Sequence, residues 1–306
     1  MTDTVASVSL ARPLEDLADE LGRSFSEYGF AIVRDHGIDA DLIARAEEKS
    51  RAFFALPDPV KRAYHIAGGG GARGYTPFGT ERAKDADIHD LKEFWHVGRD
   101  LPEGDPLVEF MPPNVWPDEV EDFRATFQEL FAAFEEAGST ILSAIALHLE
   151  LERDWFDATV DKGNSVMRLL HYPPVESEAG AIRAAAHEDI NTITLLLGAE
   201  EAGLELLSRQ GEWIAVSPPP GALAVNIGDM LQRLTNGRLR STTHRVVNPV
   251  GEAARRSRYS MPFFLHFRPD FQIEALPGCV GAGESAQPPI SAHDYLMERL
   301  REINLA

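Results

Sequence analysis

Short apolar runs fill the second half of the chain, and they limit the available folds more than any other feature. From residue 165 onward they recur between clusters of glycine, proline and asparagine, which are residues that favour turns. Runs of this length are typical of strands, and many of them in succession indicate an antiparallel sandwich or barrel. We expect strands at residues 166–170, 192–197, 204–207, 213–216, 222–227, 245–247 and 260–267.

The first 160 residues favour helices instead. Leu14, Leu17 and Leu21 recur at spacings of three and four, as in an amphipathic helix over residues 14–28, and Gly29 would end that helix. The other expected elements are strands at 30–33 and 94–97, a helix capped by Asp39 and running to about residue 55, a glycine-rich loop at 68–79, a helix from 118 to about residue 149 with a break near Gly138 left open, and a helix at 291–304.

Helices followed by strands indicate an α+β or mainly β fold in which N-terminal helices buttress a β core. We divide the chain into a mainly helical region at 1–160, a β core at 161–290 and a C-terminal helix at 291–306. A chain of 306 residues can bury a large apolar core, so it needs neither disulfides nor metal ions merely to fold.

The composition restricts the partners of the protein and the ligands of any metal. Lysine and arginine number 29 against 49 aspartates and glutamates, and the net charge of −20 argues against nucleic acid as the main partner. Cys279 is the only cysteine, so any metal site must use histidines and carboxylates. No apolar run approaches the roughly 18 residues of a membrane span, and residues 1–13 show no secretory pattern. We therefore expect a cytoplasmic protein without a membrane partner, and its oligomeric state stays open.

Two histidines are followed, two residues later, by a carboxylate. His148 and Glu150 lie at the end of the long predicted helix, where residues two apart point in nearly opposite directions, so we reject this pair. His187 and Asp189 precede a β-rich run, and residues two apart on a strand share a face. The second pair is therefore the candidate for binding a metal.

Residues further along the chain strengthen this candidate. His244 precedes another β-type run, and two histidines with one carboxylate are the facial triad of non-haem Fe(II) oxygenases. Arg258 and Ser260 also share strand spacing, and a guanidinium with a hydroxyl suits a carboxylate ligand. Considered alone, His244 fits an ordinary polar residue at a strand end. Considered alone, Arg258 fits a member of a solvated basic cluster. The joint order His-X-Asp, His, Arg-X-Ser is much rarer than either.

Several words of the sequence resemble the iron and 2-oxoglutarate dependent dioxygenases of the isopenicillin N synthase-like superfamily. The matching words are EYGFAIVRDHGI at 27–38, RLLHYPP at 168–174, HEDINTITLLL at 187–197, VNIGDMLQRLTNGRLRSTTHRVV at 225–247 and RYSMPFF at 258–264. The resemblance implies a double-stranded β-helix, or jelly roll, wrapped by N-terminal helices, with residues 161–290 as the catalytic core.

The resemblance also implies roles for single residues. His187, Asp189 and His244 would bind Fe(II), and Arg258 and Ser260 would hold the distal carboxylate of 2-oxoglutarate. Tyr172 would complete that pocket. With O2 as the oxidant, the enzyme would oxidise a small organic substrate, usually by hydroxylation, and release succinate and CO2.

One position departs from the family pattern. Many plant members have asparagine where this chain has Leu170, so a hydrogen bond to the cosubstrate is missing there unless His171 replaces it. The resemblance alone leaves two other functions open. One is an Fe(II) oxidase that does not use 2-oxoglutarate, as in isopenicillin N synthase, and the other is a non-catalytic metal-binding sensor.

Other residues have two interpretations each. Asp229 fits a turn or a helix cap better than a catalytic role. Arg73 and Tyr75, beside the glycine run at 68–71, belong either to a loop that closes on a substrate or to a plain surface loop. Lys92, Trp95 and His96 are pocket residues or ordinary strand residues, and the sequence does not decide between the two.

Overall fold

The computed structural model describes residues 5–68, 71–80, 92–174, 183–198, 203–248 and 255–302. The helices are α1 (Leu14–Tyr28), α2 (Ala40–Phe54), α3 (Asp58–Arg62), α4 (Phe123–His148), α5 (Asp157–Val160), α6 (Asp229–Leu234) and α7 (Ala292–Glu302), with short 3₁₀ helices at Pro106–Phe110 and Pro277–Cys279. The strands are β1 (Ser7–Ser9), β2 (Phe30–Arg34), β3 (Gly74–Thr76), β4 (Glu93–Gly98), β5 (Val166–Tyr172), β6 (Ala184–His187), β7 (Ile193–Leu197), β8 (Leu204–Leu207), β9 (Trp213–Ala215), β10 (Leu223–Ile227), β11 (His244–Val246), β12 (Arg258–Leu265), β13 (Gln272–Ile273) and β14 (Ile290–Ser291).

Two facing sheets form the core of the protein. The major sheet has eight strands in the order β1-β2-β10-β7-β12-β5-β4-β3, and the minor sheet has four in the order β6-β11-β8-β9. Apolar residues of both sheets pack together, among them Ile32 and Ala224 of the major sheet and Leu204 and Leu206 of the minor sheet. This two-sheet arrangement is the jelly roll that the sequence resemblance implies, and its inner faces enclose the candidate site.

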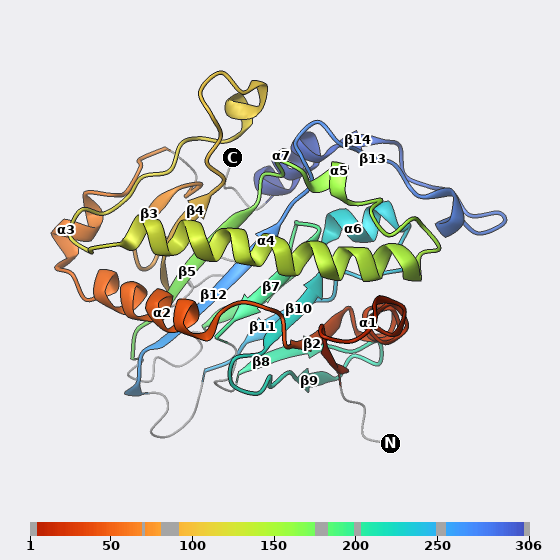
Figure 1. Ribbon diagram of the computed structural model, residues 1–306, viewed down its shortest axis with the longest axis horizontal. Coiled ribbons are helices and arrows are strands. Elements are labelled where there is room, and N and C mark those ends of the chain that lie inside the picture. Colours follow the sequence, from red (N-terminus) through yellow and green to blue (C-terminus); the bar gives the residue numbers. More distant parts are fainter. Residues whose placement is uncertain are drawn as a thin grey trace.

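Helices cover the outer face of the major sheet. Figure 1 shows α4 crossing in front of the central strands, with α1 and α2 below it. Phe134 of α4 stacks on Phe263 of β12 with ring centres 5.1 Å apart. α4 is long and apolar enough to cross a membrane by length and composition, but 56% of that apolar stretch is buried inside the protein. Packing on the sheet therefore accounts for its apolar character.

α4 starts later than the predicted helix, and it settles the break that was left open near Gly138. It begins at Phe123 rather than at residue 118, after Asp122 adopts a left-handed backbone conformation (φ 57°). It also continues without a break through Gly138. A Cβ atom at Gly138 would lie 2.4 Å from the Leu265 side chain, so the glycine allows α4 to approach β12 closely.

Two local predictions near the N-terminus are confirmed. α1 ends where Gly29 adopts a left-handed conformation (φ 67°) and its N–H bonds the carbonyl oxygen of Phe25. Asp39 caps α2, because its side chain accepts hydrogen bonds from the backbone N–H groups of Asp41 and Leu42. These two ends fix β2 between the helices.

The expected strands are all present, with ends that differ by a few residues. Five further strands of the described residues, β1, β3, β6, β13 and β14, were not predicted. β3 lies inside the stretch predicted as loop, because Gly74–Thr76 pairs with β4. β6 was missed since its run of alanines has no strand-like apolar alternation. The C-terminal helix is α7, and the predicted end at 304 lies outside the described residues.

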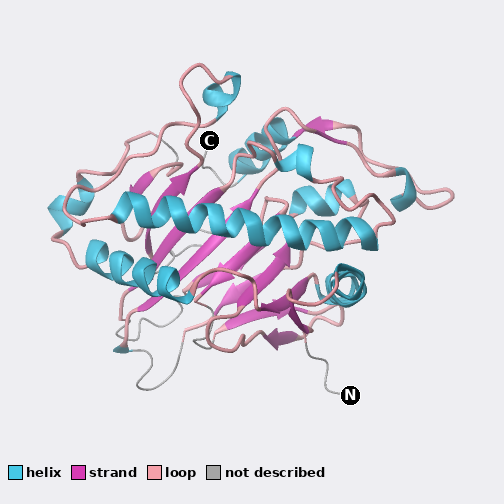
Figure 2. Ribbon diagram, viewed as in Figure 1, coloured by secondary structure: helices cyan, strands magenta, loops and turns pink. Residues whose placement is uncertain are grey.

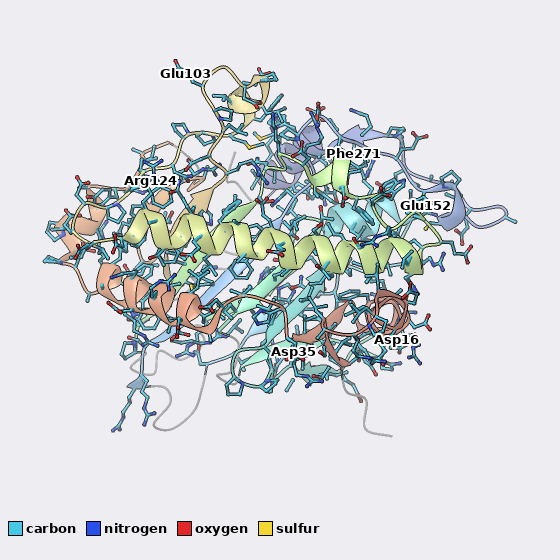
Figure 3. All side chains as sticks on the ribbon, in the orientation of Figure 1. Asp16, Asp35, Glu103, Arg124, Glu152 and Phe271 are labelled. Atoms are coloured by element: carbon cyan, nitrogen blue, oxygen red, sulfur yellow. The ribbon has the colours of Figure 1, made fainter. Side chains whose placement is uncertain are left out.

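The N-terminal region contributes strands as well as helices (Figure 2). β2 pairs with β10, and β4 pairs with β5, so the first 160 residues share the major sheet with the β core. Exposed charged side chains lie around the outside of the molecule, as the labelled Asp16, Asp35 and Glu152 show in Figure 3.

Candidate metal centre

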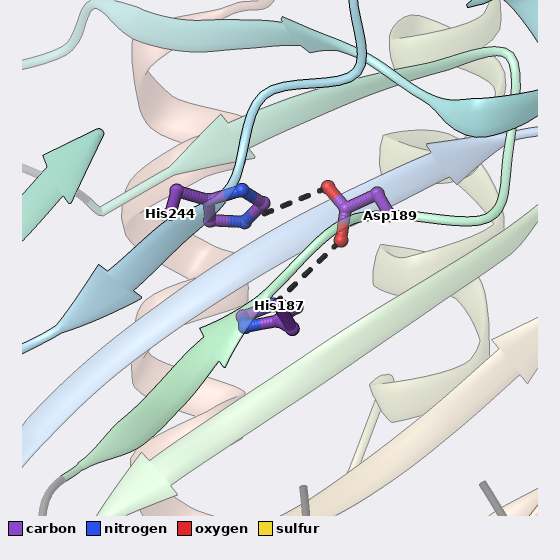
Figure 4. A group of neighbouring side chains, drawn as sticks. All are labelled: His187, Asp189 and His244. Carbon is purple, nitrogen blue, oxygen red and sulfur yellow. Dashed lines mark ion pairs between the residues drawn. The ribbon is translucent and has the colours of Figure 1, made fainter. Parts of the chain in front are cut away.

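His187, Asp189 and His244 meet at the inner face of the minor sheet (Figure 4). His187 ends β6 and His244 begins β11, and the two residues are direct partners across these antiparallel strands. Their ring centres lie 4.4 Å apart. One ligand atom of each of the three residues lies within 4.8 Å of those of the other two, so they can hold one divalent ion.

Backbone hydrogen bonds orient both histidines toward this point. His187 Nδ1 lies 2.7 Å from the carbonyl oxygen of Ala185, and His244 Nδ1 lies 3.0 Å from that of Thr242. A carbonyl only accepts, so each Nδ1 carries the proton and each Nε2 keeps a free lone pair. The two Nε2 atoms are the atoms that face Asp189, at 3.8 Å each. This is the tautomer that a metal-binding histidine needs.

Asp189 is held by two side chains of the major sheet. Its Oδ2 accepts hydrogen bonds from Thr194 Oγ1 at 2.6 Å and from Asn226 Nδ2 at 2.8 Å. Burial alone would raise the pKa of Asp189, but His244 and His187, together with these hydrogen bonds, lower it below its usual value. Desolvation and the neighbouring His244 lower the pKa of His187, although its side chain is 41% exposed. At neutral pH the site therefore offers one carboxylate and a neutral imidazole, which are the protonation states that metal binding requires.

The prediction that His187 and Asp189 share the face of one strand is wrong, although the two side chains do meet. Asp189 lies in the loop after β6, so alternation along a strand does not bring it toward His187. The hydrogen bonds from Thr194 and Asn226 do so instead. The rejection of His148 is confirmed, because it ends α4 and packs against Gly22 and Ser26 of α1.

Arg258, Ser260 and Tyr172 share the inner face of the major sheet. Arg258 pairs with Tyr172 across β12 and β5, and its guanidinium carbon lies 5.4 Å from the Tyr172 ring centre. Arg258 is 1% exposed and Ser260 2%. Within the described residues, the Nε and one terminal nitrogen of Arg258 are buried without a hydrogen-bond partner. Two such donors on a planar cation fit the two oxygens of a carboxylate.

His171 does not replace the asparagine that many plant members of the resembled superfamily have at position 170. Its ring stacks on Tyr259, with centres 4.7 Å apart, and both residues point to the outer face of the sheet. There His171 Nδ1 contacts Glu93 Oε1 at 2.7 Å. Leu170 points to the inner face, where it packs with Phe94 and Tyr172. The inner face beside Tyr172 is thus apolar at this position.

Arg73, Tyr75 and Trp95 have structural roles. Tyr75 is 1% exposed, and its hydroxyl donates a hydrogen bond to the buried Glu93. Arg73 is 3% exposed and lies against Gly98. Trp95 packs edge-on against Phe53, with ring centres 4.7 Å apart, on the helix-covered side of the sheet. Asp229 begins α6, and its backbone N–H bonds the carbonyl oxygen of Asp189.

Phe264 and Arg168 were not predicted as site residues, whereas His96 was left open as a possible pocket residue. Phe264 is the cross-strand partner of Thr194, which holds Asp189, and it is half-buried. The Arg168 guanidinium carbon lies 4.2 Å from the Phe94 ring centre and 5.5 Å from that of Phe264. Arg168 Nε donates to His96 Nε2 at 2.6 Å. Strand parity places these side chains inward, but only the tertiary structure shows that they lie beside the triad.

Known proteins resemble this chain over most of its length. Residues 5–119 match the family described as non-haem dioxygenase in morphine synthesis N-terminal, and residues 163–267 match the 2OG-Fe(II) oxygenase superfamily. A 2-oxoglutarate-Fe(II) type oxidoreductase of Emericella nidulans, hxnY, is 35% identical over 292 residues, which cover 92% of this chain and 82% of that protein. The chain belongs to the 2OG-Fe(II) oxygenase superfamily. A 2-oxoglutarate-dependent dioxygenase of Didymella fabae is 32% identical and covers 92% of this oxygenase and 89% of its own length.

Solved structures show the same fold. A 2OG-Fe(II) oxygenase family protein of Caulobacter crescentus has 51% identity and a TM-score of 0.92, with 99% of this oxygenase and 100% of that chain covered. A full-length Neurospora crassa protein in complex with alpha-KG and thymine has 29% identity and a TM-score of 0.86, covering 97% and 96% of the two chains. The oxygenase is therefore a dioxygenase that uses Fe(II) and 2-oxoglutarate, and it belongs to the superfamily that the sequence motifs indicate.

Proposed function

We propose that His187, Asp189 and His244 bind the Fe(II) of this oxygenase and that Arg258, Ser260 and Tyr172 bind 2-oxoglutarate. The observation that carries the proposal is the convergence of three metal-binding atoms within 4.8 Å, from two stretches of chain more than 50 residues apart. The unpartnered nitrogens of the buried Arg258 support the second part, because a buried guanidinium favours an anionic ligand.

Iron and 2-oxoglutarate held by these residues would supply the activation of dioxygen, with succinate and CO2 as the products of the cosubstrate. The protein residues position these groups. Thr194 and Asn226 keep the Asp189 carboxylate in one orientation, and the backbone carbonyls of Ala185 and Thr242 keep both imidazoles turned with Nε2 inward. Leu170 and Phe94 line the pocket with apolar surface, which excludes water from the space beside Tyr172.

The geometry also indicates where a substrate binds. Along β12, Arg258 and Ser260 lie toward one end of the inner face and Phe264 toward the other, next to Thr194. We infer that a small organic substrate binds beside Phe264 and Arg168, on the opposite side of the triad from Arg258. An aromatic ring and a planar guanidinium would suit a flat molecule, and the Neurospora crassa protein that binds thymine shares the fold.

Anaerobic spectroscopy tests the metal and cosubstrate assignments together. Adding 2-oxoglutarate to the protein loaded with Fe(II) should produce a visible charge-transfer band, and Asp189→Ala and His244→Ala should lose both the iron and the band. His293→Ala, which removes a histidine of α7 far along the chain from the triad, is the matched control and should keep both. Iron binding by His244→Ala equal to that of the wild type would overturn the ligand assignment.

Product analysis tests the substrate side. Succinate formation should require added 2-oxoglutarate and should rise with a flat heterocycle such as thymine or 5-formyluracil more than with an aliphatic compound of similar size. Succinate formation stimulated only by aliphatic compounds would refute a flat substrate. Oxygen consumption without succinate would instead indicate an oxidase that does not use 2-oxoglutarate.

A further inference from the structure

Two buried arginines approach one tyrosine from opposite sheets. Arg183 and Arg258 are each 1% exposed, which makes them the most deeply buried arginines among the described residues. Arg183 directly precedes β6 of the minor sheet, and Arg258 begins β12 of the major sheet. Their guanidinium carbons lie 5.7 Å and 5.4 Å from the ring centre of Tyr172.

Arg183 also lies close to both parts of the proposed site along the chain. It precedes His187 by four residues, at the start of the strand that carries this histidine. Its terminal nitrogen Nη2 is 3.5 Å from the carbonyl oxygen of Arg256, two residues before Arg258. The Arg183 guanidinium is therefore at the start of β12, in the region where Arg258 and Tyr172 meet.

Two cationic guanidiniums beside one buried tyrosine make this region favourable for an anion. 2-Oxoglutarate supplies such an anion. Its keto acid end chelates iron in this superfamily, and its second carboxylate lies several bonds away. Other contacts of Arg183 do not conflict with this, because a guanidinium has five N–H donors and can serve more than one acceptor.

We propose that Arg183 is a second cation of the 2-oxoglutarate pocket, acting with Arg258 on the distal carboxylate. This rests on the proposed function of Arg258 and Tyr172, and it adds a residue from the minor sheet to the pocket. Arg183 thereby contributes to the choice of a dicarboxylic over a monocarboxylic 2-oxoacid. Because the same strand ends at His187, the cosubstrate and the iron are positioned by one segment of chain.

The test compares two ligands that share the iron-chelating end. 2-Oxoglutarate has the distal carboxylate and pyruvate does not. The dissociation constant of each is measured without oxygen on the Fe(II)-loaded protein, by the visible charge-transfer band and by calorimetry. Arg183→Gln should weaken 2-oxoglutarate binding by about tenfold to 100-fold, the usual effect of a lost hydrogen bond between charged groups, and change pyruvate binding by less than about twofold.

Two further variants make the result decisive. Arg256→Gln removes an exposed arginine from the same region, and it should change neither ligand. Arg183→Lys retains the charge and much of the side-chain length, so it should weaken 2-oxoglutarate by an intermediate factor and serve if Arg183→Gln does not fold. Iron content and circular dichroism of every variant should match the wild type.

Each outcome separates the two proposals. Equal loss of both ligands in the Arg183 variants would mean that Arg183 only supports the structure, and no loss of either would mean that it does not act on the cosubstrate. Both results would overturn the role of Arg183. If Arg258→Gln selectively loses 2-oxoglutarate while the Arg183 variants do not, the proposed function stands and only this inference fails. A wild-type protein that binds neither ligand would instead contradict the proposed function.

Discussion

Asn226 donates a hydrogen bond from Nδ2 to Oδ2 of Asp189 over 2.8 Å, although 37 residues separate the two along the chain. Asn226 lies within β10, and its partner lies in a loop between β6 and β7. The carboxylate that faces both histidines is thus oriented by a strand of the opposite sheet. The geometry of the proposed metal ligands therefore depends on how the two sheets pack.

Removing the support of Asp189 should weaken metal binding without removing a ligand. We expect Asn226→Leu and Thr194→Val each to lower the affinity for Fe(II) by roughly tenfold to 100-fold, because partners that orient a ligand typically contribute that much. Competition with a chelator of known affinity measures the change. Thr140→Val removes a threonine hydroxyl from α4 and is the control. Affinities equal to that of the control would show that Asp189 needs no external orientation.

Gly29 should be far less tolerant of alanine than Gly37. Both have a positive φ, at 67° and 81°, but a Cβ atom at Gly29 would lie 2.3 Å from Thr242 Oγ1 and 2.5 Å from the Arg240 carbonyl oxygen. Nothing lies within 4 Å of a Cβ atom at Gly37. We expect Gly37→Ala to lower the free energy of unfolding by about 1–2 kcal/mol and Gly29→Ala by about 3 kcal/mol or more.

Chemical denaturation of the two glycine variants measures this difference. Because Thr242 supplies the carbonyl that orients His244, Gly29→Ala should also weaken iron binding, whereas Gly37→Ala should not. Similar losses of stability in both variants would contradict the close packing of the α1 terminus against the segment before His244.

The buried Lys61–Glu93 ion pair should be sensitive to loss of one partner. Lys61 Nζ lies 2.7 Å from Glu93 Oε2, with side chains 9% and 6% exposed. Burial would raise the pKa of Glu93, but hydrogen bonds from His171, Lys61 and Tyr75 hold it below its usual value. Lys61→Met leaves this carboxylate charged and buried, so we expect a loss of about 3–5 kcal/mol in the free energy of unfolding.

A double variant and an exposed pair complete this test. Lys61→Met with Glu93→Leu should recover much of the loss, since no charge remains buried. Lys49→Met breaks the ion pair with Glu48, whose side chain is 73% exposed, and should change stability by less than about 0.5 kcal/mol. If the single and double variants were equally unstable, the loss would reflect packing and not the buried charge.

His266 should make stability depend on pH in mildly acidic solution. Burial lowers the pKa of His266 to about 4, against an ordinary value of 6.5. Between these values the unfolded chain binds a proton that the folded chain does not, so the His266 contribution to stability is present above pH 6.5 and is lost as the pH falls toward 4. The difference in unfolding free energy between wild type and His266→Gln should shrink by up to about 3 kcal/mol over this range.

Urea titrations of metal-free protein at several pH values measure this contribution, and the comparison with His266→Gln removes the effects of other titrating groups. Burial raises the pKa of Asp229 to about 6, so its contribution to stability increases as the pH falls. Because both proteins contain Asp229, this contribution cancels when their unfolding free energies are subtracted. A difference between the two proteins that does not vary with pH would show that His266 is not buried as a neutral group.

Local pattern was enough to predict which candidate side chains lie on strands or share a strand face. Arg258 and Ser260 are two residues apart on β12, and this spacing alone predicts that they share a face of the strand. His187 and His244 were chosen because each adjoins a β-type run, and they do pair across neighbouring strands. The motifs of the superfamily then connected these separate segments.

Other parts of the site could not be predicted because they depend on contacts between the sheets. Nothing in the local sequence shows that Thr194 and Asn226 point at Asp189, or that Arg183 lies beside Tyr172.

For Arg73 and Tyr75, the local sequence suggested a more mobile environment than the structure shows. Their glycine-rich neighbourhood suggested a loop, but pairing of β3 with β4 buries both residues. Glycine content reports backbone freedom, and it does not report which tertiary partner restricts that freedom.

The pairing of β2 with β10 and of β4 with β5 has a consequence for the chain as a folding unit. A fragment that begins at residue 161 would expose two long strand edges with unbonded N–H and C=O groups. Such edges recruit other chains, so the fragment would aggregate rather than form a smaller working enzyme. Within the folded protein, the N-terminal strands cover these edges and prevent them from pairing with other chains.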